Sequence, residues 1–261
     1  MAFDADRIAR LLETEHRTAT AFRPLGPESG ITALDQAYDV QKALVALNAA
    51  ARGTRPAGYK IGLTTPRMQA FCGIDHPVAG TVLADRIVAS GARLDPVRYG
   101  RLGIEFEICV RLAHDLPPRA APYAPAEVAE VVDGVCPAIE IIDDRGADYA
   151  VLDAVSLVAD NAWNEGIVLG AFRQDFPDLA RVNGTASLNG TVIGSGTGAD
   201  VLGHPLAAIA WLAQHLGSRG RRLEAGDLVM TGSIVATRFP QRGEHYRFGI
   251  PGLGSVEVEI G

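Results

Sequence analysis

The chain has 261 residues, of which 48% are hydrophobic and 6% aromatic, and its formal net charge is −7. This composition is typical of a folded protein with a sizeable core, and the lack of a Lys/Arg cluster argues against a nucleic-acid partner. No apolar run approaches the ~18 residues of a membrane span. The N-terminus has no signal-peptide pattern, and Cys72, Cys109 and Cys136 form no paired motif, so we expect no disulfide and a cytoplasmic location.

The first 55 residues are predicted to form a helical N-terminal portion. Asp4 can cap a first helix whose inner face carries Ile8, Leu11 and Leu12. Residues 32–35 resemble a capping box that starts a second helix, which should end near Gly53. We expect this second helix to face inward with Leu34, Ala37, Leu44 and Leu47.

From residue 56 to residue 261 the pattern changes to short strands and turns, which predicts a second, mainly β domain. Asn189-Gly190 is a strong hairpin signal, whereas the glycine-rich stretch 194–198 lacks the lysine of a phosphate loop and is interpreted as a flexible connection. Helices are expected at 125–132 and 205–216. Strands are expected at 59–63, 80–83, 87–89, 103–110, 136–142, 163–169, 185–193, 227–231, 246–250 and 255–260. The fold class is therefore α+β, mainly β.

Three glutamates on two of these strands are the strongest chemical signal. Glu105 and Glu107 share one face of their strand, since side chains alternate, while Ile104, Phe106, Ile108 and Val110 share the other. A Glu-x-Glu pair alone is more often the solvated face of an edge strand. However, Glu140 lies inside an apolar strand, where a carboxylate is costly unless it meets a cation. Three converging carboxylates would suit Mg²⁺ or Mn²⁺.

Other polar residues give weaker signals. Lys60 lies in a strand between two glycines, although most lysines are solvated. Asp160 and Asn161 follow an apolar run and are interpreted as turn formers. The segment Thr231-Gly232-Ser233 ends a strand and can present hydroxyl and backbone N–H donors to a carboxylate, as ordinary turns also do.

Five motifs in one order resemble the 2-keto-4-pentenoate hydratase / 4-oxalocrotonate decarboxylase branch of the fumarylacetoacetate hydrolase superfamily. They are residues 58–64 (GYKIGLT), 105–107 (EFE), 137–143 (PAIEIID), 158–162 (VADNA) and 201–205 (VLGHP). The resemblance implies a mixed β-sheet roll with a helical N-terminal portion, and homo-oligomers that can associate with a pathway partner enzyme. It also implies a Mg²⁺ or Mn²⁺ ion held by Glu105, Glu107 and Glu140, catalytic roles for Lys60 and Glu105, and substrate contacts from Lys60, Thr231, Gly232 and Ser233.

The same resemblance leaves the reaction open between related chemistries on a 2-keto acid. The leading interpretation is a hydratase that adds water to a 2-hydroxy-2,4-dienoate in aromatic catabolism. Val78 stands where the hydratases are expected to have an acidic partner for the lysine, and an aliphatic residue there favours a 2-oxo-3-hexenedioate (4-oxalocrotonate) decarboxylase. An acylpyruvate-type C–C hydrolase is a further alternative, although those hydrolases usually have Asp at the position of Glu140. A non-catalytic scaffold is disfavoured by the intact glutamates and Lys60.

Overall fold

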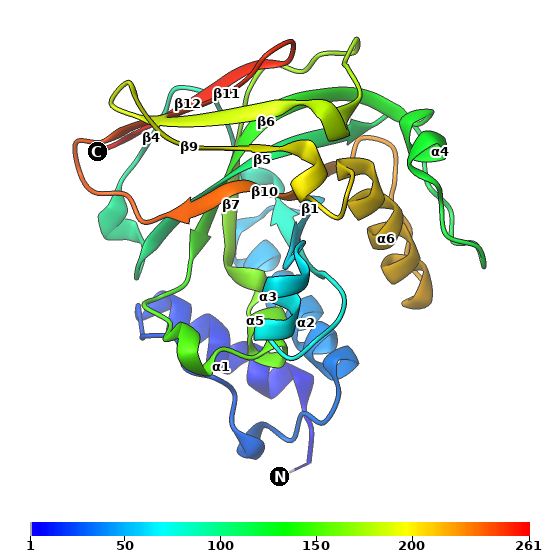
Figure 1. Ribbon diagram of the computed structural model, residues 1–261. Coiled ribbons are helices and arrows are strands. Elements are labelled where there is room, and N and C mark those ends of the chain that lie inside the picture. The colour runs from blue at the N-terminus through cyan, green and yellow to red at the C-terminus, as the bar shows by residue number, and fades with distance from the viewer. Residues whose placement is uncertain (1) are drawn as a thin grey trace.

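A computed structural model describes residues 2–261 as two β-sheets with the helices gathered mainly to one side of them (Figure 1). The seven-stranded sheet has the order β2-β1-β10-β5-β6-β7-β3, and the five-stranded sheet has the order β4-β12-β11-β8-β9. The larger sheet consists of β1 (Pro56–Gly62), β2 (Val78–Leu83), β3 (Ile87–Ala89), β5 (Leu102–Leu112), β6 (Val132–Asp143), β7 (Asn164–Leu169) and β10 (Leu228–Arg238). The smaller consists of β4 (Ala92–Leu94), β8 (Asn183–Leu188), β9 (Thr191–Thr197), β11 (His245–Ile250) and β12 (Gly254–Ile260).

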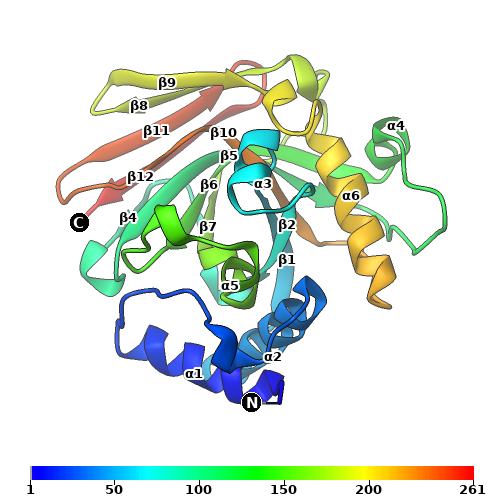
Figure 2. The same cartoon turned by 60° about the horizontal axis from the view of Figure 1, so that its bottom comes forward.

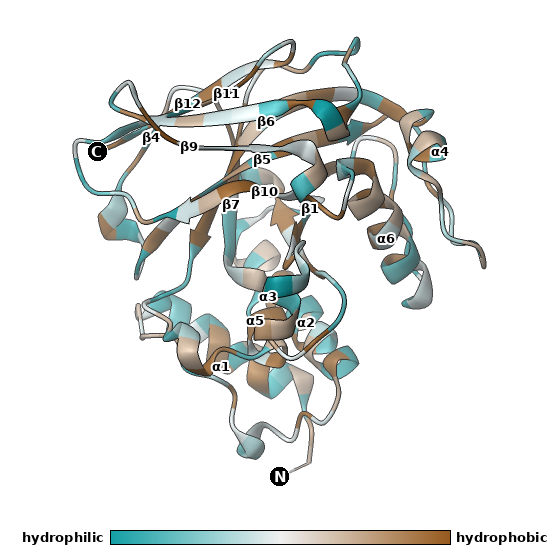
Figure 3. Cartoon of the chain, in the orientation of Figure 1, coloured by the Kyte–Doolittle hydropathy of each residue, from teal (hydrophilic) through white to brown (hydrophobic). Residues whose placement is uncertain are grey.

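The helices lie mostly on the side of the molecule away from the smaller sheet. They are α1 (Ala5–Arg17), α2 (Leu34–Arg52), α3 (Pro66–Phe71), α4 (Pro125–Ala129), α5 (Ala154–Ala159) and α6 (Pro205–Ser218). Figure 2 shows α1 and α2 together at the end of the molecule opposite β8 and β9. Polar and apolar residues alternate along α1, α2 and α6 in Figure 3, as expected for helices that bury one face. No helix within residues 2–261 is long and apolar enough to cross a membrane.

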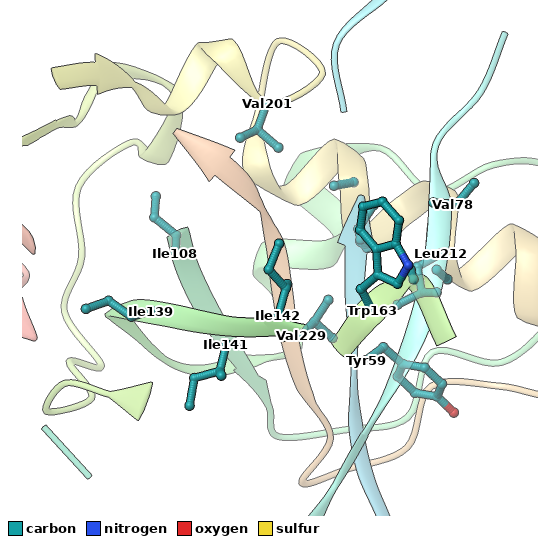
Figure 4. Packing of buried hydrophobic residues seen from close by; sticks show 14 of the residues in the cluster. Tyr59, Val78, Ile108, Ile139, Ile141, Ile142, Trp163, Val201, Leu212 and Val229 are labelled. Atoms are coloured by element: carbon teal, nitrogen blue, oxygen red, sulfur yellow. The ribbon is translucent and has the colours of Figure 1, made fainter. Parts of the chain in front are cut away.

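The apolar face of β5 takes part in the contact between the two sheets. Ile104, Phe106 and Ile108 are fully buried, and the Phe106 ring lies 5.6 Å from that of Phe248 on β11. The neighbouring strand β6 follows the same alternation, since Ile141 and Ile142 project to opposite sides of it (Figure 4). Because β5 pairs with β10 on one side and β6 on the other, it is an interior strand, and the edge-strand alternative is wrong.

The predicted α+β, mainly β class is confirmed, and the main core cluster includes residues of α1, α2 and both sheets. The division at residue 55 stays a prediction. The helix predicted to reach residue 132 ends at Ala129 because β6 already begins at Val132, whereas α6 and the Asn189-Gly190 hairpin are confirmed. All three cysteines are buried and free.

Three local predictions were wrong, each for a physical reason. Leu11 is 46% exposed because it lies ~100° around the helix from the buried Leu12. The second helix is capped by Ala33, and the side chain of Gln36 rather than Asp35 reaches back to the backbone N–H groups of Thr32 and Ala33. The stretch 194–197 is part of β9, which pairs with β8 and approaches β10 closely: a Cβ on Gly196 would lie 2.3 Å from the Ile234 oxygen.

Candidate metal centre

The three predicted glutamates converge on the face of the large sheet that points away from the smaller sheet. Glu105 and Glu107 project from β5, and Glu140 on β6 lies directly opposite Glu105 in the strand register. One carboxylate oxygen from each of the three lies within 4.8 Å of the others. The arrangement follows from the period-two alternation of β5 together with the pairing of β5 and β6.

Each carboxylate is held through one oxygen and offers the other. Glu107 Oε2 accepts a hydrogen bond from the Gly232 N–H at 2.9 Å, and Glu105 Oε1 accepts one from the Thr237 hydroxyl at 2.6 Å. Glu107 Oε1 and Glu140 Oε2 are buried and have no hydrogen-bond partner. Buried polar atoms are nearly always satisfied in folded proteins, so two such oxygens within one group of three carboxylates indicate a cation site.

The electrostatics of the centre agree with this interpretation. Burial raises the pKa of Glu107 well above its usual value, and the negative charges of Glu140 and Glu105 raise it further. Burial also raises the pKa of Glu140 to about 7, although Lys60 opposes the shift. A hard divalent cation with oxygen ligands is the group that would keep three such carboxylates ionised together. The donor set therefore fits Mg²⁺ or Mn²⁺.

Lys60 is a buried member of the same cluster, with only 4% of its surface exposed. Its Nζ lies 3.3 Å from Glu140 Oε1. Burial lowers the pKa of Lys60, but the charges of Glu140, Glu105 and Glu107 outweigh that effect and leave the pKa raised. The three carboxylates thus favour the ammonium form of Lys60, and the burial of the side chain shows that the surface-lysine alternative is wrong.

Curvature of the sheet makes the contact between Lys60 and Glu140 possible. Their strands, β1 and β6, are separated by β10 and β5, which in a flat sheet would place them about 14 Å apart at ~4.8 Å per strand. The pairing of β10 with β5 shifts register three times between Met230 and Arg238. Such bulges bend a strand and increase its twist, and here they curl the sheet around the centre.

Val78 provides an apolar wall next to the lysine. It is fully buried at the start of β2 and pairs with Gly62. Lys60 Nζ and Val78 Cγ2 lie 3.3 Å and 3.5 Å from the position of a Cβ atom built on Gly62. The ammonium therefore has the glutamates on one side and a hydrocarbon side chain close by.

The Thr231–Ser233 segment supports the centre through its hydrogen bonds. The Thr231 hydroxyl donates to the Ile108 oxygen at 3.0 Å, and the Ser233 hydroxyl donates to the Val235 oxygen at 2.6 Å. Only the Gly232 N–H points to a metal-centre residue, Glu107. The predicted contact of these three residues with a substrate carboxylate stays a prediction.

Asp160 and Asn161 form a turn, as predicted, but they do more than terminate α5. Asp160 is buried and pairs with Arg145 at 2.8 Å and with His16 at 2.6 Å. The Asn161 side-chain amide accepts a hydrogen bond from the Thr81 N–H and donates one to the Thr81 carbonyl oxygen. Asn164, which no sequence motif indicated, donates a hydrogen bond to Glu140 Oε1 at 2.9 Å. The only sequence feature that pointed to a hydrogen-bond donor for Glu140 was the isolation of this carboxylate in an apolar strand.

The model of the fumarylacetoacetate (FAA) hydrolase C-terminal family matches residues 69–260. The chain belongs to this family. Within the family it is similar to 4-oxalocrotonate decarboxylase of Pseudomonas sp, with 30% identity over 96% of this chain and 95% of that protein. It is also similar to 2-keto-4-pentenoate hydratase 2 of Dechloromonas aromatica (strain RCB), with 33% identity over 97% of this chain and 96% of that protein.

Solved structures of family members resemble this chain throughout its length. 4-oxalocrotonate decarboxylase from Pseudomonas putida G7, complexed with magnesium and adipate, matches with a TM-score of 0.91 and 30% identity over 98% of this chain and 97% of that one. The same protein has been solved with calcium and acetate. The predicted family and fold are thus confirmed, and the relatives are enzymes named as hydratases and decarboxylases, both of which are lyases.

Proposed function

We propose that this chain is a metal-dependent lyase that adds water to a 2-hydroxy-2,4-dienoate of the 2-keto-4-pentenoate type. Glu105, Glu107 and Glu140 would hold Mg²⁺ or Mn²⁺. The observation that carries the proposal is the pair of buried carboxylate oxygens without hydrogen-bond partners, on Glu107 and Glu140, beside the ammonium group of Lys60. The names of the family's relatives support the same class of reaction.

The bound ion would supply Lewis-acid stabilisation of the negative charge that develops on the keto oxygen of a 2-keto acid. The protein's own groups have distinct tasks around it. Lys60, held as an ammonium group by the glutamates, donates a hydrogen bond to a developing oxyanion and can return a proton to the dienolate. Thr237 and the Gly232 N–H fix the orientation of Glu105 and Glu107. The segment 231–233 is the proposed contact for the substrate carboxylate.

Decarboxylation of a 2-oxo-3-hexenedioate is the second candidate, and Val78 is the observation that favours it. Hydration requires a group that orients or deprotonates the attacking water, and the fully buried side chain of Val78 has no such group. Loss of CO₂ passes through the same dienolate and needs no water. The two reactions therefore share the metal centre and Lys60 and differ in what surrounds the far end of the substrate.

Parallel assays of the purified protein with Mg²⁺ test the proposal. One assay contains 2-hydroxypenta-2,4-dienoate and the other 2-oxo-3-hexenedioate, and both ultraviolet absorbance and CO₂ are followed. Loss of the dienoate signal without CO₂ supports the hydratase, whereas CO₂ from the diacid assigns the decarboxylase. If neither substrate is converted although the metal is bound, both reactions are rejected. If the protein binds neither Mg²⁺ nor Mn²⁺, the metal centre is rejected and a non-catalytic scaffold is favoured.

We further propose that the protein acts in the cytoplasm, in the catabolism of aromatic compounds, as a homo-oligomer that can associate with a pathway partner enzyme. The relatives named as 2-keto-4-pentenoate hydratases support the catabolic assignment, and three buried cysteines without a disulfide are typical of a reducing compartment. Light scattering coupled to size-exclusion chromatography tests the oligomer, because a mass of 27.5 kDa in solution would identify a monomer.

A further inference from the structure

Residues 161–163 form a left-handed turn next to the metal centre. Asn161, Ala162 and Trp163 have φ angles of 52°, 48° and 61°, and none of them is glycine. Single residues visit this conformation, but consecutive non-glycine residues rarely do so because each Cβ crowds the following carbonyl oxygen. A strained segment of this kind persists only where the surrounding structure holds it, and such segments cluster at functional sites.

Contacts on three sides hold the turn in place. The Asn161 amide donates to the Thr81 oxygen at 2.9 Å and accepts from the Thr81 N–H at 2.7 Å. The Trp163 ring packs edge-on against Phe22 at 5.2 Å and Tyr149 at 5.8 Å. A Cβ on Gly80 would lie 2.6 Å from the Asn161 oxygen and 3.0 Å from Lys60 Cγ, so the glycine lets the turn lie against β2 and Lys60.

The residue that follows the turn reaches the metal centre. Asn164 Nδ2 donates to Glu140 Oε1 at 2.9 Å, and Lys60 Nζ lies 3.3 Å from the same oxygen. The other oxygen of this carboxylate, Oε2, is buried and has no partner. Two donors thus share Oε1, while Oε2 is left for the group that Glu105 and Glu107 also face.

We propose that Asn164 is a positioning residue, which the left-handed turn places so that it orients Glu140 with Oε2 toward the metal. This inference rests on the proposed metal centre and assigns to the turn a role in metal binding. An amide suits the position, since it donates to an oxygen and adds no charge next to three carboxylates. Residues that orient metal ligands typically change metal affinity by about 10- to 100-fold when they are replaced.

Titration calorimetry with Mn²⁺ on the protein stripped of metal tests the role of Asn164 without an activity assay. Asn164→Ala should bind Mn²⁺ about 10- to 100-fold more weakly than the unchanged protein. Asn48→Ala is the matched control: Asn48, on α2, lines the same polar cavity of about 310 Å³ as Asn164, and its side chain makes no hydrogen bond within residues 2–261. The Asn48→Ala variant should bind Mn²⁺ with the same affinity as the unchanged protein. Equal affinity in Asn164→Ala and the unchanged protein would overturn the inference.

A double-substitution cycle separates positioning from a merely structural role. If Asn164 acts through Glu140, Asn164→Ala should weaken Mn²⁺ binding in the normal background but much less in a Glu140→Asp background, which keeps a carboxylate ligand but withdraws it by one methylene from the Asn164 amide. Equal losses in both backgrounds would refute the inference. Asn164→Ser, which keeps a hydroxyl donor, provides the comparison should the alanine variant fail to fold. Absence of Mn²⁺ binding in the unchanged protein would instead reject the metal centre itself.

Discussion

Protonation of His16 should make the stability of this protein depend on pH in a specific window. His16 Nε2 lies 2.6 Å from Asp160 Oδ1, and Nδ1 lies 3.5 Å from Glu165. Burial lowers the pKa of His16, but the hydrogen bonds with Asp160 and Glu165 outweigh it and raise the pKa to about 9. Arg145 shares the Asp160 carboxylate, and its Nη1 also lies 2.7 Å from His16 Nε2, so its positive charge lowers the pKa of His16 without reversing the rise.

The magnitude follows from the difference between the folded and unfolded pKa values. A rise from 6.5 to about 9 corresponds to about 3 kcal/mol at ~1.4 kcal/mol per pKa unit. Because the folded value is the higher one, this stabilisation is fully present below pH 6.5 and is lost as the pH rises through 9. It joins α1 to the segment that follows α5, so its loss should loosen the N-terminal helices.

Urea unfolding of the metal-free protein and of His16→Gln between pH 6 and pH 10 measures this contribution. The variant should be less stable by about 3 kcal/mol at pH 6, and the difference should shrink toward zero near pH 10. Comparing the two proteins at each pH cancels the titration of all other groups. A difference that stays constant across this range would show that His16 is not protonated in the folded state and would refute the reasoning.

Three further predictions concern the metal centre. Glu107→Gln should abolish activity and Mn²⁺ binding while leaving the circular dichroism spectrum unchanged, and normal turnover in this variant would contradict the ligand assignment. Gly80→Ala should lower stability by about 1–3 kcal/mol and reduce activity, because the added methyl group would displace the Asn161 oxygen and Lys60; unchanged melting and turnover would argue against this packing. Val78→Asp should raise the ratio of hydration to CO₂ release by placing a carboxylate beside Lys60, and an unchanged ratio would show that this position does not choose the reaction.

The glutamates were predictable from the sequence because their signal is local. Alternation places Glu105 and Glu107 on one face of a strand, and a carboxylate within the apolar run around Glu140 needs a cation. The pairing of Glu105 with Glu140 follows once the two strands are neighbours. For the same reason the apolar face of β5 and the Asn189-Gly190 hairpin were predicted correctly.

The burial of Lys60 was not predictable in this way because it depends on the shape of the sheet. Its strand and that of Glu140 are separated by two others, and the contact depends on register shifts in the pairing of β10 with β5. A sequence pattern gives the faces of a strand but not the position of its bulges. The left-handed turn at 161–163 escaped prediction similarly, since its conformation is imposed by Thr81, Phe22 and Tyr149 from distant parts of the chain.

The charge balance of the centre explains why such a site suits dienolate chemistry. With one divalent cation bound, three ionised carboxylates and one ammonium group would give the centre no net charge. A buried cluster that is neutral before the substrate enters can bind a 2-keto acid anion without a large unpaired charge of its own. In the proposed reaction, the negative charge on the keto oxygen would be stabilised by Lys60 and by a divalent ion held by the three glutamates, since such interactions are stronger where water is excluded. In this proposal the fate of the dienolate would depend on neighbours such as Val78, while its formation would depend on the cluster itself.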